Sequence, residues 1–174
     1  LTQWTGIRRL VQLPLAGLIT GATIWSTHFI AMLSYNPGYA HGYEPVLTGV
    51  SLLVGVLGAL AANAGLAYGR SQYAVYGAGT IFGLSVAAMH YTGMNAYLLP
   101  GTIVWSIPRL VASVLLGAGF GALSYGLIVK NLGGMAGRVW PAGAMVLAIC
   151  LMHFTGMSAI EIRLDSSVVV PPMA

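Results

Sequence analysis

A histidine followed four residues later by a methionine occurs three times along the sequence. In chain order the pairs are His28 with Met32, His90 with Met94, and His153 with Met157. Residues four positions apart are neighbours on one face of a helix, so each pair would present an imidazole beside a thioether. Successive histidines are 62 and 63 residues apart, which indicates an internal repeat that returns the same chemistry at a fixed interval.

Further sulfur atoms accompany two of the three histidines. Met89 directly precedes His90, and Met152 directly precedes His153. The first segment has Thr27 at that position, so it offers one thioether fewer. A cysteine also lies three residues before the third histidine, on the same helical face. The predicted metal ligands are therefore His28, His90, His153, Met32, Met94, Met157, Met89, Met152 and Cys150.

The residue types in this set indicate a soft metal. Neutral imidazole binds copper, zinc or iron, whereas a methionine thioether selects Cu(I). Zinc sites rarely use a thioether, and calcium or magnesium would need carboxylates that the apolar segments lack. We therefore expect copper as the cofactor. An alternative stays open, because buried histidines also form hydrogen bonds between helices and methionines also fill gaps in a core.

The elements that hold these residues are expected to be membrane helices. Hydrophobic residues make up 57% of the chain and charged residues 6%, whereas about 25% of a soluble globular chain is charged. A helix needs about 20 apolar residues to cross a bilayer. Five stretches satisfy that requirement, at residues 13–35, 46–69, 75–99, 109–130 and 139–161. They are too long and continuous for barrel strands, so the predicted fold is an all-α, polytopic transmembrane helical bundle.

Each repeat is expected to be a hairpin of two helices, because one period contains two spans and their joints. The repeats lie at about 13–70, 75–138 and 139–174, the last incomplete, within a single domain that covers residues 1–174. Since one period crosses the membrane twice, the histidines return to the same leaflet. Ionisable residues inside a membrane are costly, so three at one depth favour a functional site. His41, in the joint at 36–45, is expected to have a solvated or capping role instead.

The basic residues predict the orientation in the lipid bilayer. Five of them would lie on one side of the membrane, namely Arg8, Arg9, Arg70, Lys130 and Arg138. Only Arg109 and Arg163 would lie on the other side, beside all three acidic residues. An excess of Lys and Arg marks the cytoplasmic side, so the His/Met segments are expected near the outer face. The basic residues are too scattered to form a nucleic-acid-binding surface.

The segment Met89-His90-Tyr91-Thr92, together with its counterparts at 25–32 and 150–157, resembles the MHYT domain, a bacterial integral membrane sensor module. The resemblance covers essentially the whole chain and includes the tail that begins at Arg163. Two positions depart from the family pattern, since Thr27 replaces a usual methionine and Ala31 a usual glycine.

This resemblance implies a sensory input domain in the bacterial inner membrane, with its motifs near the periplasmic side. Such a domain would bind copper through histidine and methionine, and would sense copper or a diatomic gas, O2, CO or NO. The resemblance also implies a cytoplasmic output partner, fused or associated, such as the GGDEF and EAL domains of cyclic di-GMP turnover or a histidine kinase.

Three other functions remain open from the sequence. A protein of membrane copper transport or handling would carry thioethers at several depths. A haem membrane protein would use two of the histidines as axial ligands. A structural membrane anchor would use the histidines only to join helices, and would hold no stoichiometric metal. An enzyme is not expected in this chain, because no nucleophile with an adjacent base, paired carboxylates or phosphate-binding loop is found.

Overall fold

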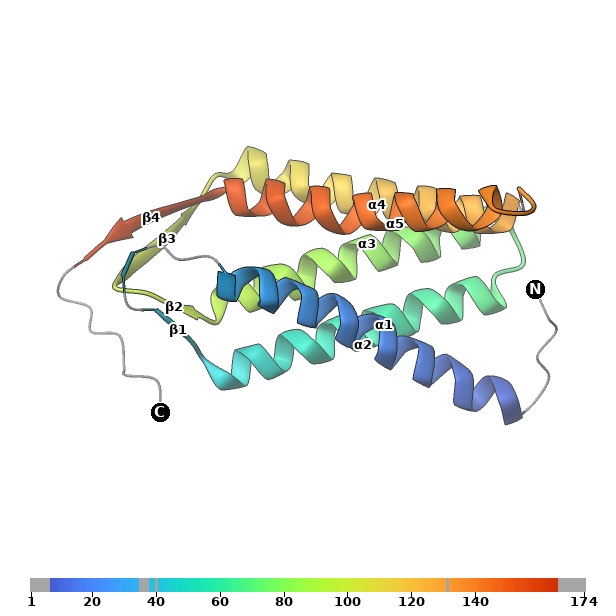
Figure 1. The fold of residues 1–174 in the computed structure, drawn as a ribbon, viewed down its shortest axis with the longest axis horizontal. Helices are drawn as coiled ribbons and strands as arrows, with labels where there is room; N and C mark the ends of the chain where they lie inside the picture. The colour runs from blue at the N-terminus through green and yellow to red at the C-terminus, as the bar shows by residue number, and fades with distance from the viewer. Residues whose placement is uncertain (1–6, 35–37, 40, 131, 166–174) are drawn as a thin grey trace.

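The computed structural model describes residues 7–34, 38–39, 41–130 and 132–165, and these residues form a bundle of five long helices (Figure 1). In chain order the helices are α1 (Ile7–Ser34), α2 (Pro45–Tyr68), α3 (Gln72–Asn95), α4 (Ile107–Lys130) and α5 (Ala136–Ser158). All but α3 are long and apolar enough to cross a membrane on their own. Helix α3 has the same length as α2 and α4 but lies at the centre of the bundle. The predicted helical membrane bundle is confirmed.

Local capping explains where the helices begin. The Glu44 carboxylate accepts hydrogen bonds from the backbone N–H groups of Val46 and Leu47, at 2.9 and 2.6 Å. Ser71 caps α3 in the same way, by accepting from the N–H of Ala74 at 3.2 Å. These bonds satisfy N–H groups that have no partner inside the helix. The second and third helices therefore start within a few residues of the predicted apolar stretches.

Two of the predicted spans extend too far. The third was expected to reach residue 99 and the fifth residue 161, but α3 ends at Asn95 and α5 at Ser158. The chain then forms two small antiparallel pairs, β1 (Gly42–Tyr43) with β2 (Tyr97–Leu98) and β3 (Gly101–Trp105) with β4 (Ile160–Leu164). Ile160, at the end of the predicted fifth span, and Ile162, just beyond it, are β-branched residues, which also suit a strand. They pair with Trp105 and Ile103 of β3.

The helices pack in a regular order that close contacts explain. Helix α2 packs against α1 and α3, and α4 packs against α3 and α5. Gly21 of α1 lies against the backbone of Val56 in α2, and Gly83 of α3 lies against the backbone of Gly117 in α4. A Cβ atom at Gly21 or Gly83 would overlap the partner backbone, so both interfaces depend on glycine. Successive helices run in opposite directions, so α1, α3 and α5 run in the same direction and end on the same side of the bundle (Figure 1).

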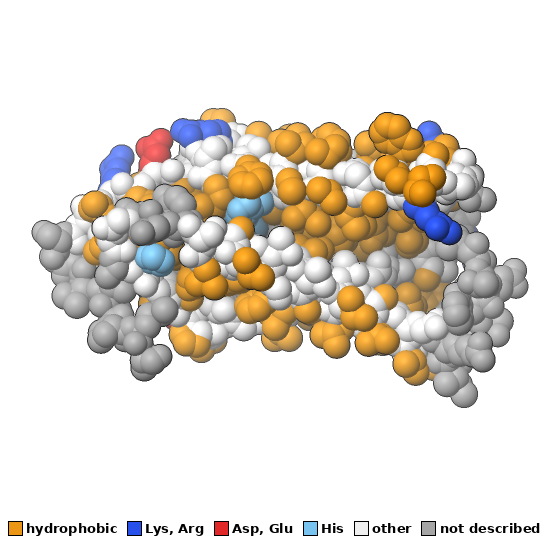
Figure 2. Space-filling view, viewed as in Figure 1, with side chains coloured by type: hydrophobic (Ala, Val, Ile, Leu, Met, Phe, Trp, Pro, Cys, Tyr) orange, Lys and Arg blue, Asp and Glu red, His pale blue; other side chains and the backbone are white. Residues whose placement is uncertain are grey.

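The outside of the bundle suits lipid. Hydrophobic side chains cover the middle of the face in Figure 2, and charged side chains lie towards its two ends. Each helix exposes large apolar residues, for example Leu15, Leu53, Ile81, Leu115 and Phe154. A surface of this kind is stable in a bilayer, where the helices satisfy their own backbone polar groups. The chain is a multi-pass membrane protein.

The described helices are arranged as hairpins. Helices α1 and α2 form the first hairpin and α3 and α4 the second, at the positions of the first two predicted repeats. The third predicted repeat begins with α5, but its residues 166–174 lie outside the described part of the chain. The joints at 69–71 and 132–135 lie at one end of the bundle, and the strands lie at the other (Figure 1).

Candidate metal centre

Three histidines meet near the C-terminal ends of α1, α3 and α5, at the end of the bundle that carries the strands. The ring centroid of His28 lies 4.9 Å from that of His90 and 5.2 Å from that of His153. The His90 and His153 centroids are 5.1 Å apart. The rings are nearly perpendicular, with interplanar angles of 80°, 78° and 81°. The predicted meeting of one histidine from each repeat in a single layer is therefore confirmed.

The Nδ1 atoms of these rings face one another. The Nδ1 atom of His28 lies 3.3 Å from Nδ1 of His153 and 3.4 Å from Nδ1 of His90. Ligand atoms from all three residues lie within 4.8 Å of one another. Nitrogen atoms that bind one ion through bonds of about 2.0 Å are separated by about 3.3 to 3.5 Å in tetrahedral or trigonal geometry. The spacing of the three imidazoles therefore fits a single metal ion.

Hydrogen bonding between the rings does not account for this arrangement. A ring nitrogen is either a donor or an acceptor, so three facing Nδ1 atoms share at most one good hydrogen bond. His90 is 0% exposed and His28 is 7% exposed, while His153 is partly buried. The Nε2 atom of His90 has no hydrogen-bond partner within the described residues. Buried polar atoms without partners are costly, and hydrogen bonds among the described residues leave this cluster incompletely satisfied.

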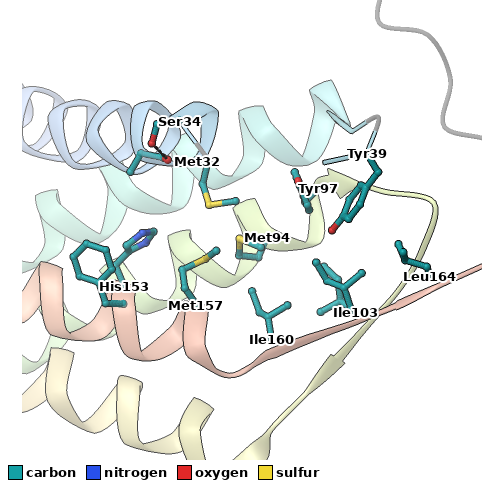
Figure 3. Close-up of a pocket in the computed structure, with 13 residues that line it drawn as sticks. Met32, Ser34, Tyr39, Met94, Tyr97, Ile103, His153, Met157, Ile160 and Leu164 are labelled. Carbon is teal, nitrogen blue, oxygen red and sulfur yellow. Dashed lines mark hydrogen bonds between the residues drawn. The ribbon is translucent and has the colours of Figure 1, made fainter. Parts of the chain in front are cut away.

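A large vestibule lies between the histidines and the strands. Its volume is about 750 Å³, and His153 lies at its edge. Met32, Met94 and Met157 line it from α1, α3 and α5. Figure 3 shows their thioethers directed into this common space, on the strand side of His153. The methionine four residues after each histidine therefore reaches the same cavity as its counterparts, as the repeat predicts.

A second, smaller cavity, the inner cavity, lies on the opposite side of the histidine layer. Its volume is about 100 Å³, and all three histidines line it. The other predicted ligands that line it are Met89, Met152 and Cys150. The remaining walls are mainly apolar and include Ile24, Val86 and Ile149. The nine predicted ligand residues thus line two cavities that share His153, with thioethers on both sides of the imidazoles.

Met89 and Met152 also have a packing role. The Cγ atom of Met89 lies 3.3 Å from where a Cβ atom of Gly55 in α2 would be. The Cγ atom of Met152 lies 3.1 Å from the corresponding position at Gly117 in α4. Both methionines therefore fill the groove beside a glycine of the neighbouring helix, in addition to lining the cavity.

His41 lies apart from the histidine layer, as the sequence predicts. Its Nδ1–H donates to the backbone carbonyl of Tyr39 at 3.1 Å, and its ring centroid lies 5.5 Å from that of Tyr97. Tyr43 of β1 lies between Tyr97 and Phe29, with ring centroids 5.4 and 5.3 Å away. Burial raises the pKa of Tyr43 to about 12. These aromatic residues form a cover over the strand end of the bundle.

Two glycines lie beneath the histidine rings and were not predicted as part of the site. A Cβ atom at Gly93 would lie 3.2 Å from Nε2 of His28, and one at Gly156 would lie 2.8 Å from Nε2 of His90. The signal was present, since both glycines occur three residues after a motif histidine. They read as ordinary packing residues, because the partner of each glycine comes from a different repeat.

Comparison with known proteins gives a family and several relatives. A model of the MHYT family, described as a bacterial signalling protein N-terminal repeat, matches residues 21–79 and again residues 83–139. The chain is 39% identical over 166 residues to an uncharacterized signaling protein of Caulobacter vibrioides, which is 95% of this chain and 20% of the relative. It is 35% identical to the cyclic di-GMP phosphodiesterase NbdA of Pseudomonas aeruginosa, over 84% of this chain and 19% of the relative.

A third relative is the bifunctional diguanylate cyclase/cyclic di-GMP phosphodiesterase MucR of Pseudomonas aeruginosa, which is 35% identical over 84% of this chain and 22% of its own length. The chain thus spans about a fifth of the length of these relatives. No solved structure matches it.

Proposed function

The chain belongs to the MHYT family of bacterial signalling repeats, and from this premise we propose that it is a copper-binding sensory input domain of the inner membrane. His28, His90 and His153 are the proposed ligands. The observation that carries the proposal is the spacing of their Nδ1 atoms, 3.3 and 3.4 Å, at the meeting point of three helices. The rings are already positioned there, so binding would need little rearrangement of the helices.

The donor atoms around the histidines favour copper over other metals. Three thioethers line the vestibule and two more line the inner cavity, beside Cys150. Thioether sulfur binds Cu(I) well and is a poor ligand for hard cations. The three acidic residues of the chain, Glu44, Glu161 and Asp165, lie outside the helices, so no carboxylate lies among the proposed ligands.

Haem is a poorer fit to this geometry. Two axial imidazoles bind haem iron from opposite faces of a wide macrocycle. Here three rings from three helices converge. Their centroids lie 4.9 to 5.2 Å apart, which leaves no space for a macrocycle between any two of them.

Copper handling is a second candidate, because the thioethers lie on both sides of the histidine layer, as a transport path would require. Close packing in the interior, towards the other end of the bundle, favours retention of copper over its passage through the bundle. Phe82 is 0% exposed and packs against Tyr125, with ring centroids 5.8 Å apart. Phe82 precedes His90 by eight residues, which is about 12 Å along the helix. A chain that retains copper suits a sensor better than a transporter.

Copper held by these residues would offer an open coordination position to O2, CO or NO, or copper occupancy itself would be the signal. Apart from the histidines, the inner cavity has mainly apolar walls, and its volume of about 100 Å³ suits a diatomic gas. The three imidazoles belong to separate hairpins, so a ligand that changes their separation also changes the packing of α1, α3 and α5. Such a ligand shifts the equilibrium only if it binds two helix arrangements with different affinity.

The output of the signal lies outside this chain. Two of the relatives are named as enzymes of cyclic di-GMP turnover, and the chain spans only about a fifth of their length. We therefore propose that the domain regulates a cytoplasmic output module of that class. The His/Met motifs then face the periplasm, because Arg70, Lys130 and Arg138 lie at the opposite end of the bundle.

Metal analysis of the purified chain tests the proposed site. The chain is loaded with Cu(I), freed of excess metal, and compared with His90→Ala, His153→Ala and His41→Ala variants. We expect one copper per chain, lost in the first two variants and retained in the third, because His41 lies outside the histidine layer. Copper retained by both His90→Ala and His153→Ala would exclude these residues as ligands. A Soret band in the purified chain would favour haem instead.

A further inference from the structure

Two of the three histidines rest on a glycine of the next motif along the chain. The Nε2 atom of His28 lies over Gly93, which is three residues after His90. The Nε2 atom of His90 lies over Gly156, which is three residues after His153. The same histidine–glycine contact therefore occurs between α1 and α3 and again between α3 and α5.

The residue after each histidine repeats this relationship. Phe29 follows His28, and its ring atoms lie 3.4 and 3.5 Å from where a Cβ atom of Gly93 would be. Tyr91 follows His90, and its hydroxyl lies 3.2 Å from the corresponding position at Gly156. Two independent contacts recur at both glycines, so the arrangement is a property of the repeat and not a chance approach of one side chain.

A third contact of the same kind, from α5 back to α1, would involve an alanine in place of a glycine. By the same relation, the partner of His153 would be the residue three places after His28, which is Ala31. Ala31 and His153 line both the vestibule and the inner cavity, so they lie in the same part of the bundle. His153 is also the least buried of the three histidines.

We propose that Gly93 and Gly156 are positioning residues of the metal centre, and that Ala31 is the equivalent, larger residue for His153. Because each glycine has no side chain, the imidazole packed against it can approach the helix closely. Its Nδ1 atom can then reach the place where the three rings meet. The extra methyl group of Ala31 holds His153 further out, so His153 is the ligand that detaches most readily. This inference rests on the proposed copper site and concerns what sets its affinity.

Substituting alanine at the glycines is predicted to have graded effects. A Cβ atom at Gly156 would lie 2.8 Å from Nε2 of His90, and one at Gly93 would lie 3.2 Å from Nε2 of His28. The first distance requires the ring to move, and the second requires a smaller adjustment. Residues that orient a metal ligand typically change metal affinity by about 10- to 100-fold when substituted. We therefore expect Gly156→Ala to weaken binding more than Gly93→Ala.

Matched controls exist in the same two helices. Gly77 of α3 and Gly143 of α5 have no atom within 4 Å of an added Cβ. Alanine favours a helix at all four positions, so loss of helix propensity cannot explain weaker binding. Gly77→Ala and Gly143→Ala are therefore expected to retain the affinity of the unsubstituted chain. The opposite change, Ala31→Gly, adds no atoms and is expected to tighten binding.

The test measures Cu(I) affinity of the full chain in nanodiscs by anaerobic competition with a chromophoric Cu(I) chelator. X-ray absorption of the copper-loaded samples then counts the nitrogen ligands. We expect fewer nitrogen ligands in Gly156→Ala, unchanged counts in both controls, and higher affinity in Ala31→Gly. A merely structural role of the glycines would leave the nitrogen count unchanged.

The outcomes separate this inference from the proposed function. If the unsubstituted chain binds no Cu(I), the copper site itself is refuted, and the positioning role with it. If the chain binds Cu(I) and the Gly93→Ala and Gly156→Ala variants bind it equally well, only the positioning role is refuted. If Gly156→Ala does not fold, Gly93→Ala and Ala31→Gly decide, and the absence of both the loss and the gain would refute the proposal.

Discussion

Arg109 at the start of α4 donates a hydrogen bond to the backbone carbonyl of Ser158, the last residue of α5. The same guanidinium pairs with Glu161 of β4 at 3.4 Å. Ser158 directly follows Met157, which lines the vestibule, so Arg109 fixes the end of the helix that carries the third motif. The carbonyl bond and the ion pair are expected to contribute unequally to stability.

Arg109→Ala is expected to lower the free energy of unfolding by about 1 kcal/mol, because it removes a charged donor from a helix-terminal carbonyl. Glu161→Gln is the comparison, and a change of less than about 0.5 kcal/mol is expected, since exposed ion pairs contribute little. The two side chains are 49% and 59% exposed. Thermal unfolding in detergent, followed by circular dichroism, measures the stability of both variants. An equal loss in the two variants would contradict this ranking.

Gly83→Ala is expected to destabilise the chain, because the new methyl group would overlap the backbone of Gly117 in α4. Overpacking of this kind typically costs about 1–3 kcal/mol. Gly119→Ala in α4 is the matched control, since nothing lies within 4 Å of its Cβ position. It is expected to be neutral or stabilising by up to about 1 kcal/mol. If both variants unfold at the same temperature as the parent chain, α3 and α4 do not approach as closely as described.

Replacing Met32, Met94 and Met157 together by leucine is expected to preserve the fold and reduce the preference for copper. Leucine and methionine have similar volumes, so packing in the vestibule changes little. Three of the five thioethers that favour Cu(I) over zinc are lost, while Met89, Met152 and the three imidazoles remain. Competition between Cu(I) and Zn(II) for the chain measures the ratio. Met135→Leu, which is 74% exposed at the opposite end of the bundle, is the control. An unchanged ratio would exclude a role for the vestibule in metal selection.

The raised pKa of Tyr43 predicts how the strand end of the bundle responds to alkaline pH. Burial raises its pKa from 10.0 to about 12, so the neutral phenol is favoured in the folded chain. The corresponding stabilisation is fully present below pH 10 and is lost as the pH rises through about 12. Spectroscopic titration of tyrosinate, compared between the parent chain and Tyr43→Phe, follows this group.

The Tyr43→Phe variant is expected to fold normally. The Tyr43 hydroxyl is buried and has no hydrogen-bond partner among the described residues, so its removal loses no bond. The variant is expected to lose the contribution of one tyrosine to the titration near pH 12, while its unfolding temperature at neutral pH is retained or raised. A large loss of stability at neutral pH would show that the hydroxyl has a partner.

The proposed orientation is tested by labelling single cysteines in intact cells. In a Cys150→Ser background, Thr102→Cys lies on the exposed side of β3, and Ser71→Cys lies in the exposed joint before α3. A membrane-impermeant maleimide is expected to label the first variant from outside and the second only after lysis. Labelling in the reverse order would place the motifs on the cytoplasmic side.

The sequence predicted the helices and the histidine layer because both are repeated signals. Apolar stretches of the right length mark the helices, and the constant interval between His28, His90 and His153 places the rings at one depth. The strands were missed because residues such as Ile160 and Ile162 are as apolar as a helix end, and hydropathy alone does not distinguish the two. Pairing with Ile103 across 59 residues decides the outcome, and such a contact is not visible in a local pattern.

The contacts of Gly93 and Gly156 with the histidine rings were not predicted for a related reason. Each glycine is recognisable within its own motif, but its partner belongs to the preceding motif on another helix. The order in which the three helices meet around the histidines determines that partner. Sequence periodicity gives the depth of a residue in the membrane and its helix face, and it leaves the identity of the opposing residue undetermined.

The contact between His28 and His153 joins two residues that are 125 positions apart in the chain. Because α1 must wait for α5 before these rings can meet, the histidine layer is among the last features to form during membrane insertion. Long-range contacts of this kind are slow to form, since much chain must be ordered first. An interrupted or incompletely inserted chain would therefore possess helices without the histidine layer, and the proposed metal site would exist only in the fully assembled protein.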